Sequence, residues 1–566
     1  QANTAMGSSA LAINTIGNYN VALGRQAMND NSTGSNNTAI GYYALVSNSS
    51  GRSNVAVGIN AARLNGAANN NVAVGDSTLF NNTVSNSVAV GSKALLSNTT
   101  GIQNTAIGFR AMQDNTIGQN NTAIGAGTLE NNTTGSYNTG AGANALLINT
   151  TGSSNTATGD NAMRFNSTGS GNTANGANAL FNNETGSRNT VLGRNALRSS
   201  VSANDNVAVG DSALLANIAS ENVAIGSKAL RFNTTGIQNT AIGYQALLKS
   251  TTTNANTAMG YKALSANNAG FSNTAIGSDA LRNNTSGFAN TAVGQNALVA
   301  NTTGVVNTSV GANALGNNTT GQANTAVGSS ALSINTTGNN NVALGRQAMN
   351  DNITGSNNTA LGFNALVSNS SGRSNVAIGI NAAAQNGAAN NNVAVGDSTL
   401  LANTASGNVA VGSKALRFNT SGTGNQAFGF EALLNTNTGS RNAAVGYQSL
   451  RTNTTGTGNT AMGYRALYAN TTASNNVAIG DSALLANTAI GNTGIGAKAL
   501  RNNTTGTGLF AGGFQALVAN TTGLNNTAIG YQSMNKNTVG FENTAVGHQA
   551  LFSLVTGDRK STRLNS

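Results

Sequence analysis

The chain has 566 residues, a formal net charge of +11 and only 8% charged residues, with 70 Gly and no Pro, Cys or Trp. The lack of Cys excludes a disulfide framework and thiol chemistry. The sequence also contains no apolar run of about 18 residues, the length that a helix needs to cross a membrane. Disordered chains are usually charged and Pro-rich, so this excess of small, β-branched and amide residues favours closely stacked short strands instead.

A short repeat runs through the sequence from Gly7 to Gly547. It is marked by a Gly that ends an Asn-x-Ala-x-Gly-like segment, as at Gly24 and Gly41. Of the 32 intervals between these glycines, 28 span 17 residues and four span 16. No gap is large enough for a separate domain, so we predict one continuous repeat region over residues 1–557.

Each repeat contains three kinds of segment, as residues 227–243 illustrate. For Ala229-Leu230 we favour a second short strand or extended arm, with a short helical turn as the alternative, because isolated short helices are marginal. Asn233-Thr-Thr-Gly236 has turn chemistry, since Asn tolerates a left-handed conformation and Gly supplies a positive φ. Asn239-Thr-Ala-Ile-Gly243 is predicted to form a strand, with its Thr and Ile on one side and its Ala on the other.

The fold class that this period predicts is an all-β, parallel β-solenoid of about 32 coils. Stacking places like residues in columns, with adjacent strands about 4.8 Å apart. Asn columns can form amide ladders from coil to coil, while Ala keeps the interior thin and Ile, Val or Leu fills it. Because so thin an interior buries little apolar area, we expect sister chains to cover one face, most readily in a homotrimer.

The four 16-residue coils share a charge pattern. Each opens with Asp-Ser, and the next coil carries Lys at its second position; the pairs are Asp76 and Lys93, Asp211 and Lys228, Asp397 and Lys414, and Asp481 and Lys498. The missing residue falls between the two Asn columns, in the turn, where deletions are best tolerated. We expect each Asp to lie near the following Lys, either as an exposed salt bridge of little energetic value or as an ion site or register marker.

The position after the repeat Gly is often aromatic. Such a broken stripe either packs against the next coil or a sister chain, which we favour, or contacts glycans or another surface. Its members are Tyr42, Phe109, Tyr244, Tyr261, Phe363, Phe430, Tyr447, Tyr464, Phe514 and Tyr531.

The sequence offers no catalytic, cofactor-binding or metal-binding residues, so we expect no enzyme activity. The only His, His548, stands in the aromatic column, and we expect it to be inert. Acidic residues form no repeated pair for acid–base catalysis, and neither a dinucleotide-binding glycine motif nor a calcium-binding glycine repeat is present. Lys and Arg are scattered along the sequence, which argues against a nucleic-acid partner.

The Asn-x-Ala-Ile-Gly-x-x-Ala signature resembles the head repeats of trimeric autotransporter adhesins, the YadA-like heads. Asn86-Ser-Val-Ala-Val-Gly91 and Asn222-Val-Ala-Ile-Gly226 match most closely, and the likeness recurs to residue 557. Similar runs occur in bacterial and phage fibre proteins that carry a self-cleaving chaperone domain. The heads have a shorter period, so the present coil looks like that unit with extra turn residues. The resemblance implies a left-handed β-roll, a homotrimer, an extracellular location and binding to host or environmental surfaces.

We therefore expect an extracellular adhesive or structural fibre segment, at the bacterial cell surface or in a phage virion, with glycans among its candidate ligands. A phage tail-fibre shaft and a self-assembling extracellular filament are alternatives. An ice-binding solenoid is less favoured, because Val often replaces Thr in the strand and each strand offers a single Thr.

The two ends of the sequence carry their own expectations. The chain opens inside a repeat at Gln1, so we expect it to be a fragment, with no stalk, anchor or chaperone domain within it. At the other end, residues 558–566 match nothing upstream and resemble one translated frame of a common sequencing adapter. We expect this segment to be a non-native tail.

Overall fold

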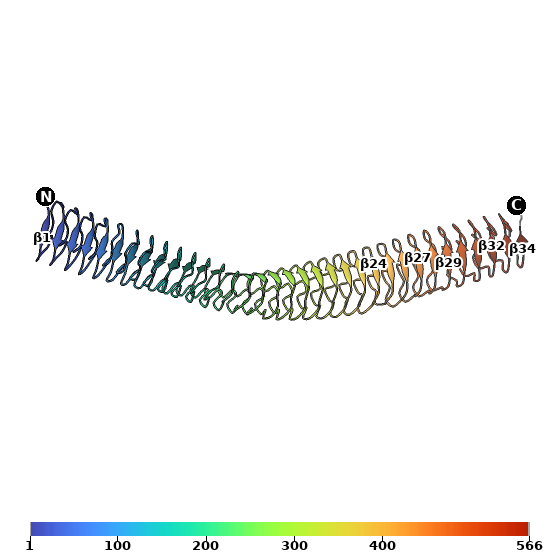
Figure 1. Cartoon of the computed structure of the whole chain (residues 1–566). Coiled ribbons are helices and arrows are strands. Elements are labelled where there is room, and N and C mark those ends of the chain that lie inside the picture. The colour runs from blue at the N-terminus through green and yellow to red at the C-terminus, as the bar shows by residue number, and fades with distance from the viewer. Residues whose placement is uncertain (1, 564–566) are drawn as a thin grey trace. The chain divides into compact units, whose positions relative to one another are not determined.

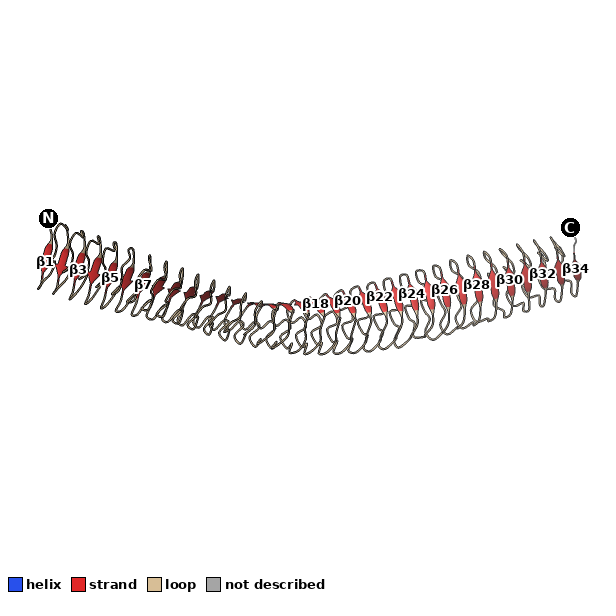
Figure 2. Ribbon diagram, in the orientation of Figure 1, coloured by secondary structure: helices blue, strands red, loops and turns tan. Residues whose placement is uncertain are grey.

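A computed structural model describes residues 2–563. Within that range the chain is an all-β parallel β-solenoid whose 34 short strands mark about 33 turns, and no helix is present among the described residues (Figure 2). The predicted fold class and the 17-residue period are confirmed. The left-handed sense of the coil, which came from the family resemblance, stays a prediction.

The chain divides into two units, residues 1–286 and 287–566. In each unit the strands follow one another in chain order, as the colour gradient shows (Figure 1). The first unit contains β1 (Thr4–Met6), β2 (Val21–Leu23), β3 (Thr38–Ile40), β4 (Val55–Val57), β5 (Val72–Val74), β6 (Val88–Val90), β7 (Thr105–Ile107), β8 (Thr122–Ile124), β9 (Thr139–Ala141), β10 (Thr156–Thr158), β11 (Thr173–Asn175), β12 (Thr190–Leu192), β13 (Val207–Val209), β14 (Val223–Ile225), β15 (Thr240–Ile242), β16 (Thr257–Met259) and β17 (Thr274–Ile276).

The second unit contains β18 (Thr291–Val293), β19 (Thr308–Val310), β20 (Thr325–Val327), β21 (Val342–Leu344), β22 (Thr359–Leu361), β23 (Val376–Ile378), β24 (Val393–Val395), β25 (Val409–Val411), β26 (Gln426–Phe428), β27 (Ala443–Val445), β28 (Thr460–Met462), β29 (Val477–Ile479), β30 (Thr493–Ile495), β31 (Phe510–Gly512), β32 (Thr527–Ile529), β33 (Thr544–Val546) and β34 (Ser561–Arg563).

Strands β2 to β33 have their middle residue, most often Ala, buried in the interior, whereas Ala5 of β1 at the end of the stack is exposed. In β15, for example, Ala241 is fully buried, whereas the Thr and Ile on either side of it are only half-buried. Strands β14 and β15 pair in parallel with Ala224 opposite Ala241, so the small residue repeats in register from coil to coil. The predicted alternation is confirmed. The expectation that Ile and Val fill the interior is wrong for the strands, because their third residue points outward, as at Ile225, which is 38% exposed.

The interior is filled from the opposite wall of the coil by an Ala-Leu or Ala-Met pair, as at Ala229 and Leu230. Both residues are fully buried. The predicted second strand is wrong here, and so is the helical alternative. The segment is a run of tight turns in which Leu230 has φ 48° and Lys228 has φ 62°.

A strand could not bury both members of this pair, because successive side chains of a strand point to opposite faces. The left-handed residue turns the chain so that Ala229 and Leu230 both face the interior. A positive φ costs a non-Gly residue about 1–2 kcal/mol, while full burial of Leu contributes about 1.5–3 kcal/mol. The backbone groups stay paired, since the Leu230 N–H donates to Ala246 O on the next coil at 3.0 Å.

Two ladders of buried Asn side chains line the rest of the interior, as expected. In the ladder that precedes the strands, the Asn324 Nδ2 donates to Gly338 O at 2.8 Å and its Oδ1 accepts the Asn341 N–H at 3.0 Å. In the ladder at the turn, the Asn352 Nδ2 donates to the Asn335 Oδ1 of the preceding coil at 2.8 Å. These amides bond polar groups that the thin interior hides from water.

The four 16-residue coils lose their residue between the two Asn ladders, as predicted. Asn403 and Asn408 are five residues apart, and the Asn408 Nδ2 donates directly to the Asn403 Oδ1 at 3.2 Å. In 17-residue coils the two columns are six residues apart, as for Asn233 and Asn239. The deletion therefore shortens a turn and leaves the strand register intact, with Val393 opposite Val409.

The segment after residue 557 forms one further coil as far as it is described. Strand β34 pairs in parallel with β33, with Ser561 opposite Thr544. The Lys560 N–H donates to the Asn543 Oδ1 at 2.8 Å, where earlier coils have an Asn at the position of Lys560. The assignment of residues 558–566 as a non-native tail stays a prediction, and residues 564–566 lie outside the described part.

Candidate binding surfaces

In each unit the strand face is the outer surface made by the first and third residues of the strands, β1 to β17 in the first unit and β18 to β33 in the second. Its first column holds mostly Thr and Val, and its third column holds mostly Ile, Val, Leu and Met. None of these strands contains Asp, Glu, Lys or Arg. The face is therefore a regular, uncharged surface in which many third-column side chains are more than a third exposed.

The charged side chains lie on the turns instead. Of the six ion pairs between described residues, the Arg451 Nε to Glu431 Oε2 contact at 2.8 Å is the most buried. The Arg188 Nε also lies 2.7 Å from Asp205 Oδ1, but both of these side chains are exposed. Exposed pairs of this kind contribute little to stability.

Glu431 is the one carboxyl with a perturbed pKa in a largely covered position. Burial raises its pKa, but hydrogen bonds from the Arg451 guanidinium and the Gln448 amide, together with the charge of Arg451, outweigh burial and lower it. The pKa of Arg451 is raised by its hydrogen bond to Glu431, against the effect of burial. The pair joins two neighbouring coils.

The Asp and Lys of the short coils are neighbours through their backbones. The Lys228 N–H donates to Asp211 O at 2.9 Å, and the Lys414 N–H donates to Asp397 O at 2.8 Å. The predicted proximity is confirmed, but none of the ion pairs between described residues joins these Asp and Lys side chains. Asp211 pairs instead with Arg194, whose Nε lies 3.0 Å from its Oδ1. The salt bridge expected there is not formed.

The aromatic column is an assembly of stacked rings. Tyr447 stacks between Phe430 and Tyr464, with ring centroids 5.4 Å apart on each side. His548 extends the column at its end, with its ring 5.1 Å from that of Tyr531. Packing against the next coil is confirmed for these rings. Since the faces cover one another, mainly ring edges remain for an outside ligand.

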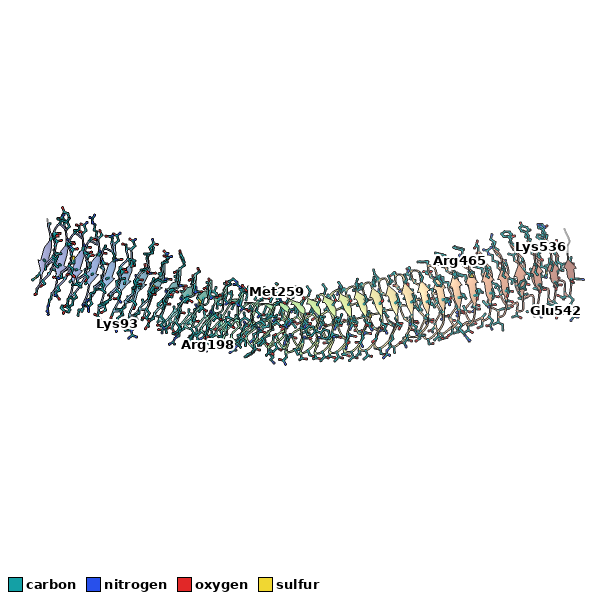
Figure 3. All side chains as sticks on the ribbon, viewed as in Figure 1. Lys93, Arg198, Met259, Arg465, Lys536 and Glu542 are labelled. Atoms are coloured by element: carbon teal, nitrogen blue, oxygen red, sulfur yellow. The ribbon has the colours of Figure 1, made fainter. Side chains whose placement is uncertain are left out.

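The basic residues are scattered in the sequence, yet one turn column collects several of them. We call it the Arg stripe. It comprises Arg164, Phe165, Phe181, Arg198, Leu215, Arg231, Phe232, Leu248 and Lys249. Figure 3 shows Arg198 among the turns, apart from Met259 of strand β16. The sequence signal for this stripe was the 34- and 33-residue separation of its three arginines, which is two coils each time.

Other site types find little support. Among residues 2–563 no group of three or more His, Cys, Asp or Glu side chains could hold a metal ion. In the same range no helix is long and apolar enough to cross a membrane.

Comparisons with known proteins do not identify a relative. No protein-family model matches the chain, and no curated protein matches it either. What is established is a parallel β-solenoid repeat protein with repeats of about 17 residues. The likeness to YadA-like heads therefore rests on the sequence signature alone.

Proposed function

We propose that this chain is a segment of an extracellular structural fibre that attaches to a host or environmental surface and assembles as a homotrimer through its strand face. In each unit a stack of similar turns provides a repeated surface, and its side chains recur in columns from coil to coil. We propose no catalytic role. The stoichiometry of three and the setting, a bacterial surface or a phage virion, come from the resemblance to YadA-like heads and fibre proteins.

The uncharged strand face is the observation that carries the proposal. A surface that stays in water normally includes charged side chains, whereas the buried centre of an interface is depleted of them. Here the turns carry the charges and 33 successive strands carry none. The apolar third column of the face in each unit is also a liability for a single exposed chain.

The exposed aliphatic side chains of the strand face supply apolar area for an interface. A buried aliphatic side chain contributes about 1.5–3 kcal/mol at about 25 cal/mol/Å², which corresponds to roughly 100 Å². With about 40% of that area exposed, as at Ile225, such a third-column side chain leaves about 40 Å². The first strand column adds to this, and stable interfaces bury about 800 Å² per partner.

The test is the mass of the chain in solution, measured by multi-angle light scattering. We expect the unmodified chain to have three times the 56.3 kDa of one chain. A variant with Lys at four strand-face positions, Ile107, Ile225, Ile378 and Ile479, should run as a monomer, because association would bury unpaired charges. The matched control places Lys at four exposed turn positions, Ile102, Ile237, Ile353 and Ile490, and should stay trimeric.

Other outcomes decide between the alternatives. Open-ended assembly that grows with concentration would favour the self-assembling filament. A monomer at all concentrations would reject the trimer and leave the strand face free. In that case the in-register Thr column makes ice binding the next hypothesis to test, by thermal hysteresis.

A further inference from the structure

We infer that the Arg stripe binds a linear acidic polysaccharide that carries about one anionic group per two sugar units. The inference deepens the adhesive part of the proposed function, because it names the ligand class of the surface to which the fibre attaches. It rests on residues of the first unit alone, between Arg164 and Lys249.

The stripe is continuous from coil to coil. Backbone hydrogen bonds join its coils, each from the residue after a stripe position to the next coil: the Phe165 N–H donates to Phe181 O at 3.1 Å. In the same way the Asn182 N–H donates to Arg198 O at 3.1 Å, and the Ser199 N–H donates to Leu215 O at 3.1 Å. The column continues in the same way, with the Ala216 N–H bonded to Arg231 O at 3.1 Å. Arg and an apolar residue therefore alternate along six successive coils.

The three guanidinium groups are held in place by aromatic rings. The guanidinium carbon of Arg164 lies 5.4 Å from the centroid of Phe165, and that of Arg198 lies 5.4 Å from the centroid of Phe181. Arg231 lies over Phe232 at 5.2 Å. Such cation–π contacts order the long side chains before a ligand arrives, which lowers the entropy lost on binding.

The same three guanidinium groups are not neutralised. None of the ion pairs between described residues includes Arg164, Arg198 or Arg231. The Nε atoms of Arg164 and Arg231 are buried without a hydrogen-bond partner in the protein. No Asp or Glu belongs to the stripe. The acidic residues closest to it in sequence, Asp160, Glu184, Asp205, Asp211 and Glu221, occupy other columns, and Glu130 of the same column stands two coils before Arg164. Positive charge is thus positioned and available.

The spacing of the charges selects the kind of polyanion. Arginines on every second coil are about 9.6 Å apart, from two strand spacings of about 4.8 Å. Nucleic-acid phosphates follow one another at about 3.4 Å along a duplex strand, so most of them would find no arginine. A polysaccharide with one acid group per disaccharide has a sparser charge that suits this spacing, and its apolar sugar faces can contact Phe165, Phe181 and Phe232.

The stripe and the proposed trimer interface do not compete for the same surface. Arg231 is seven residues after Ala224 of β14 and ten residues before Ala241 of β15, so it lies about half a coil from the strands. A trimer that buries its strand faces would therefore leave three Arg stripes facing outward. That arrangement would multiply a weak contact by avidity.

A weaker counterpart occurs in the second unit, where Arg417, Arg451 and Arg501 stand in the same column. The Arg417 guanidinium lies 5.1 Å from the centroid of Phe418, much like Arg231 over Phe232. Arg451, however, is paired with Glu431. We therefore assign the main site to the first unit.

The test is to measure, by calorimetry in low salt, the binding of a short hyaluronan oligosaccharide to the full chain. A triple variant, R164Q/R198Q/R231Q, keeps the apolar stems and removes the charges, and we expect its Kd to rise about tenfold. The matched control, R25Q/R52Q/R373Q, removes three exposed arginines of other columns and should bind within about twofold of the unmodified chain. Binding should weaken as salt is added.

Three results would overturn the inference. The first is that hyaluronan binds no tighter than neutral dextran, and the second is that the control variant loses as much hyaluronan affinity as the triple variant. The third is that a single-stranded oligothymidylate binds tighter than hyaluronan and that the triple variant loses this binding too, which would make nucleic acid the ligand. Circular dichroism checks that each variant is folded. A trimeric mass without hyaluronan binding would reject this inference and leave the proposed function standing.

Discussion

Single residues with unusual backbone conformations close each coil. Leu230 at φ 48° allows two successive side chains to face the interior, and the same conformation recurs at the Leu or Met of the other coils. The Ala-Leu pattern in the sequence indicated that both side chains are buried. It did not indicate the backbone conformation that buries them, because a positive φ at Leu runs against the ordinary preference of that residue. Packing of the neighbouring coils overrides it.

The buried Asn ladder gives a prediction at the place where it is interrupted. Leu509 stands where other coils have Asn, and it is 2% exposed. Its own N–H donates to the Asn492 Oδ1 at 3.0 Å, but it has no oxygen for the next coil. Leu509→Asn should restore the rung and stabilise the neighbouring coils by about 1–2 kcal/mol.

The measurement is amide hydrogen exchange of residues 493–530, which reports local opening. Exchange should slow in Leu509→Asn. The converse change, Asn492→Leu, should speed exchange in the same region, because the Leu509 N–H would lose its side-chain acceptor and Gly506 O would keep only its bond from Asn503. Unchanged exchange in both variants would show that the ladder has no energetic role.

The corner glycines yield a second prediction. Gly243 has φ 128°, and an added Cβ would lie 2.5 Å from Gly260 O on the next coil. Gly243→Ala should destabilise the surrounding coils by about 3 kcal/mol or more, measured as faster amide exchange over residues 226–262.

Gly407 provides the matched control for that glycine. It has φ 73° with open space around its Cα, and Asn86 fills the corresponding place of another short coil at φ 66°. Gly407→Asn should leave exchange unchanged. Equal sensitivity at both positions would contradict the argument that steric contact between coils fixes the corner.

Glu431 predicts a local dependence of stability on pH. Its pKa is lowered in the folded chain, so its contribution is fully present above the unfolded pKa of about 4.3 and is lost as pH falls through the folded pKa. Amide exchange around residues 428–451, corrected for the intrinsic effect of pH, should reveal local loosening below about pH 4. Glu431→Gln should remove this dependence; if the dependence persists, another group is responsible.

A coil tolerates a change of length only in the turn between its two Asn columns. The 16-residue coils show this, since the residue missing between Asn403 and Asn408 leaves the strand pairing intact. Inserting one Thr after Ala405 should convert this coil to 17 residues with unchanged exchange in β24 and β25. Inserting Thr after Lys414, within the turns that carry buried Leu416, should disrupt both strands, because it would move the Leu out of the interior.

Much of the coil could be predicted from the sequence, and the features that were missed were missed for physical reasons. The period placed the strand, the Gly corner and the Asn turn correctly, because residues 239–243 carry strong local preferences. Ile242 was expected to fill the interior, but it faces outward. The sequence could not reveal this, since an apolar residue is compatible both with a core and with an interface. The Arg stripe was missed because Arg164 and Arg198 become neighbours only when coils are stacked.

Each unit presents two outer surfaces with different chemistry, an uncharged strand face and turns that carry the charges. This division favours an assembly in which the strand faces meet and the turns contact the surroundings. Each coil repeats its neighbours, so functional groups of the described residues are distributed along columns. The account therefore depends on which face lies between chains.

Pulsed electron resonance on singly labelled chains tests that point most directly, and the chain has no Cys that would interfere. A label at Ile242→Cys, on the strand face, should show a short distance between chains, while a label at Thr235→Cys, on an exposed turn, should show a longer one. The account predicts this order. A shorter distance at residue 235, or no coupling between chains at residue 242, would contradict it.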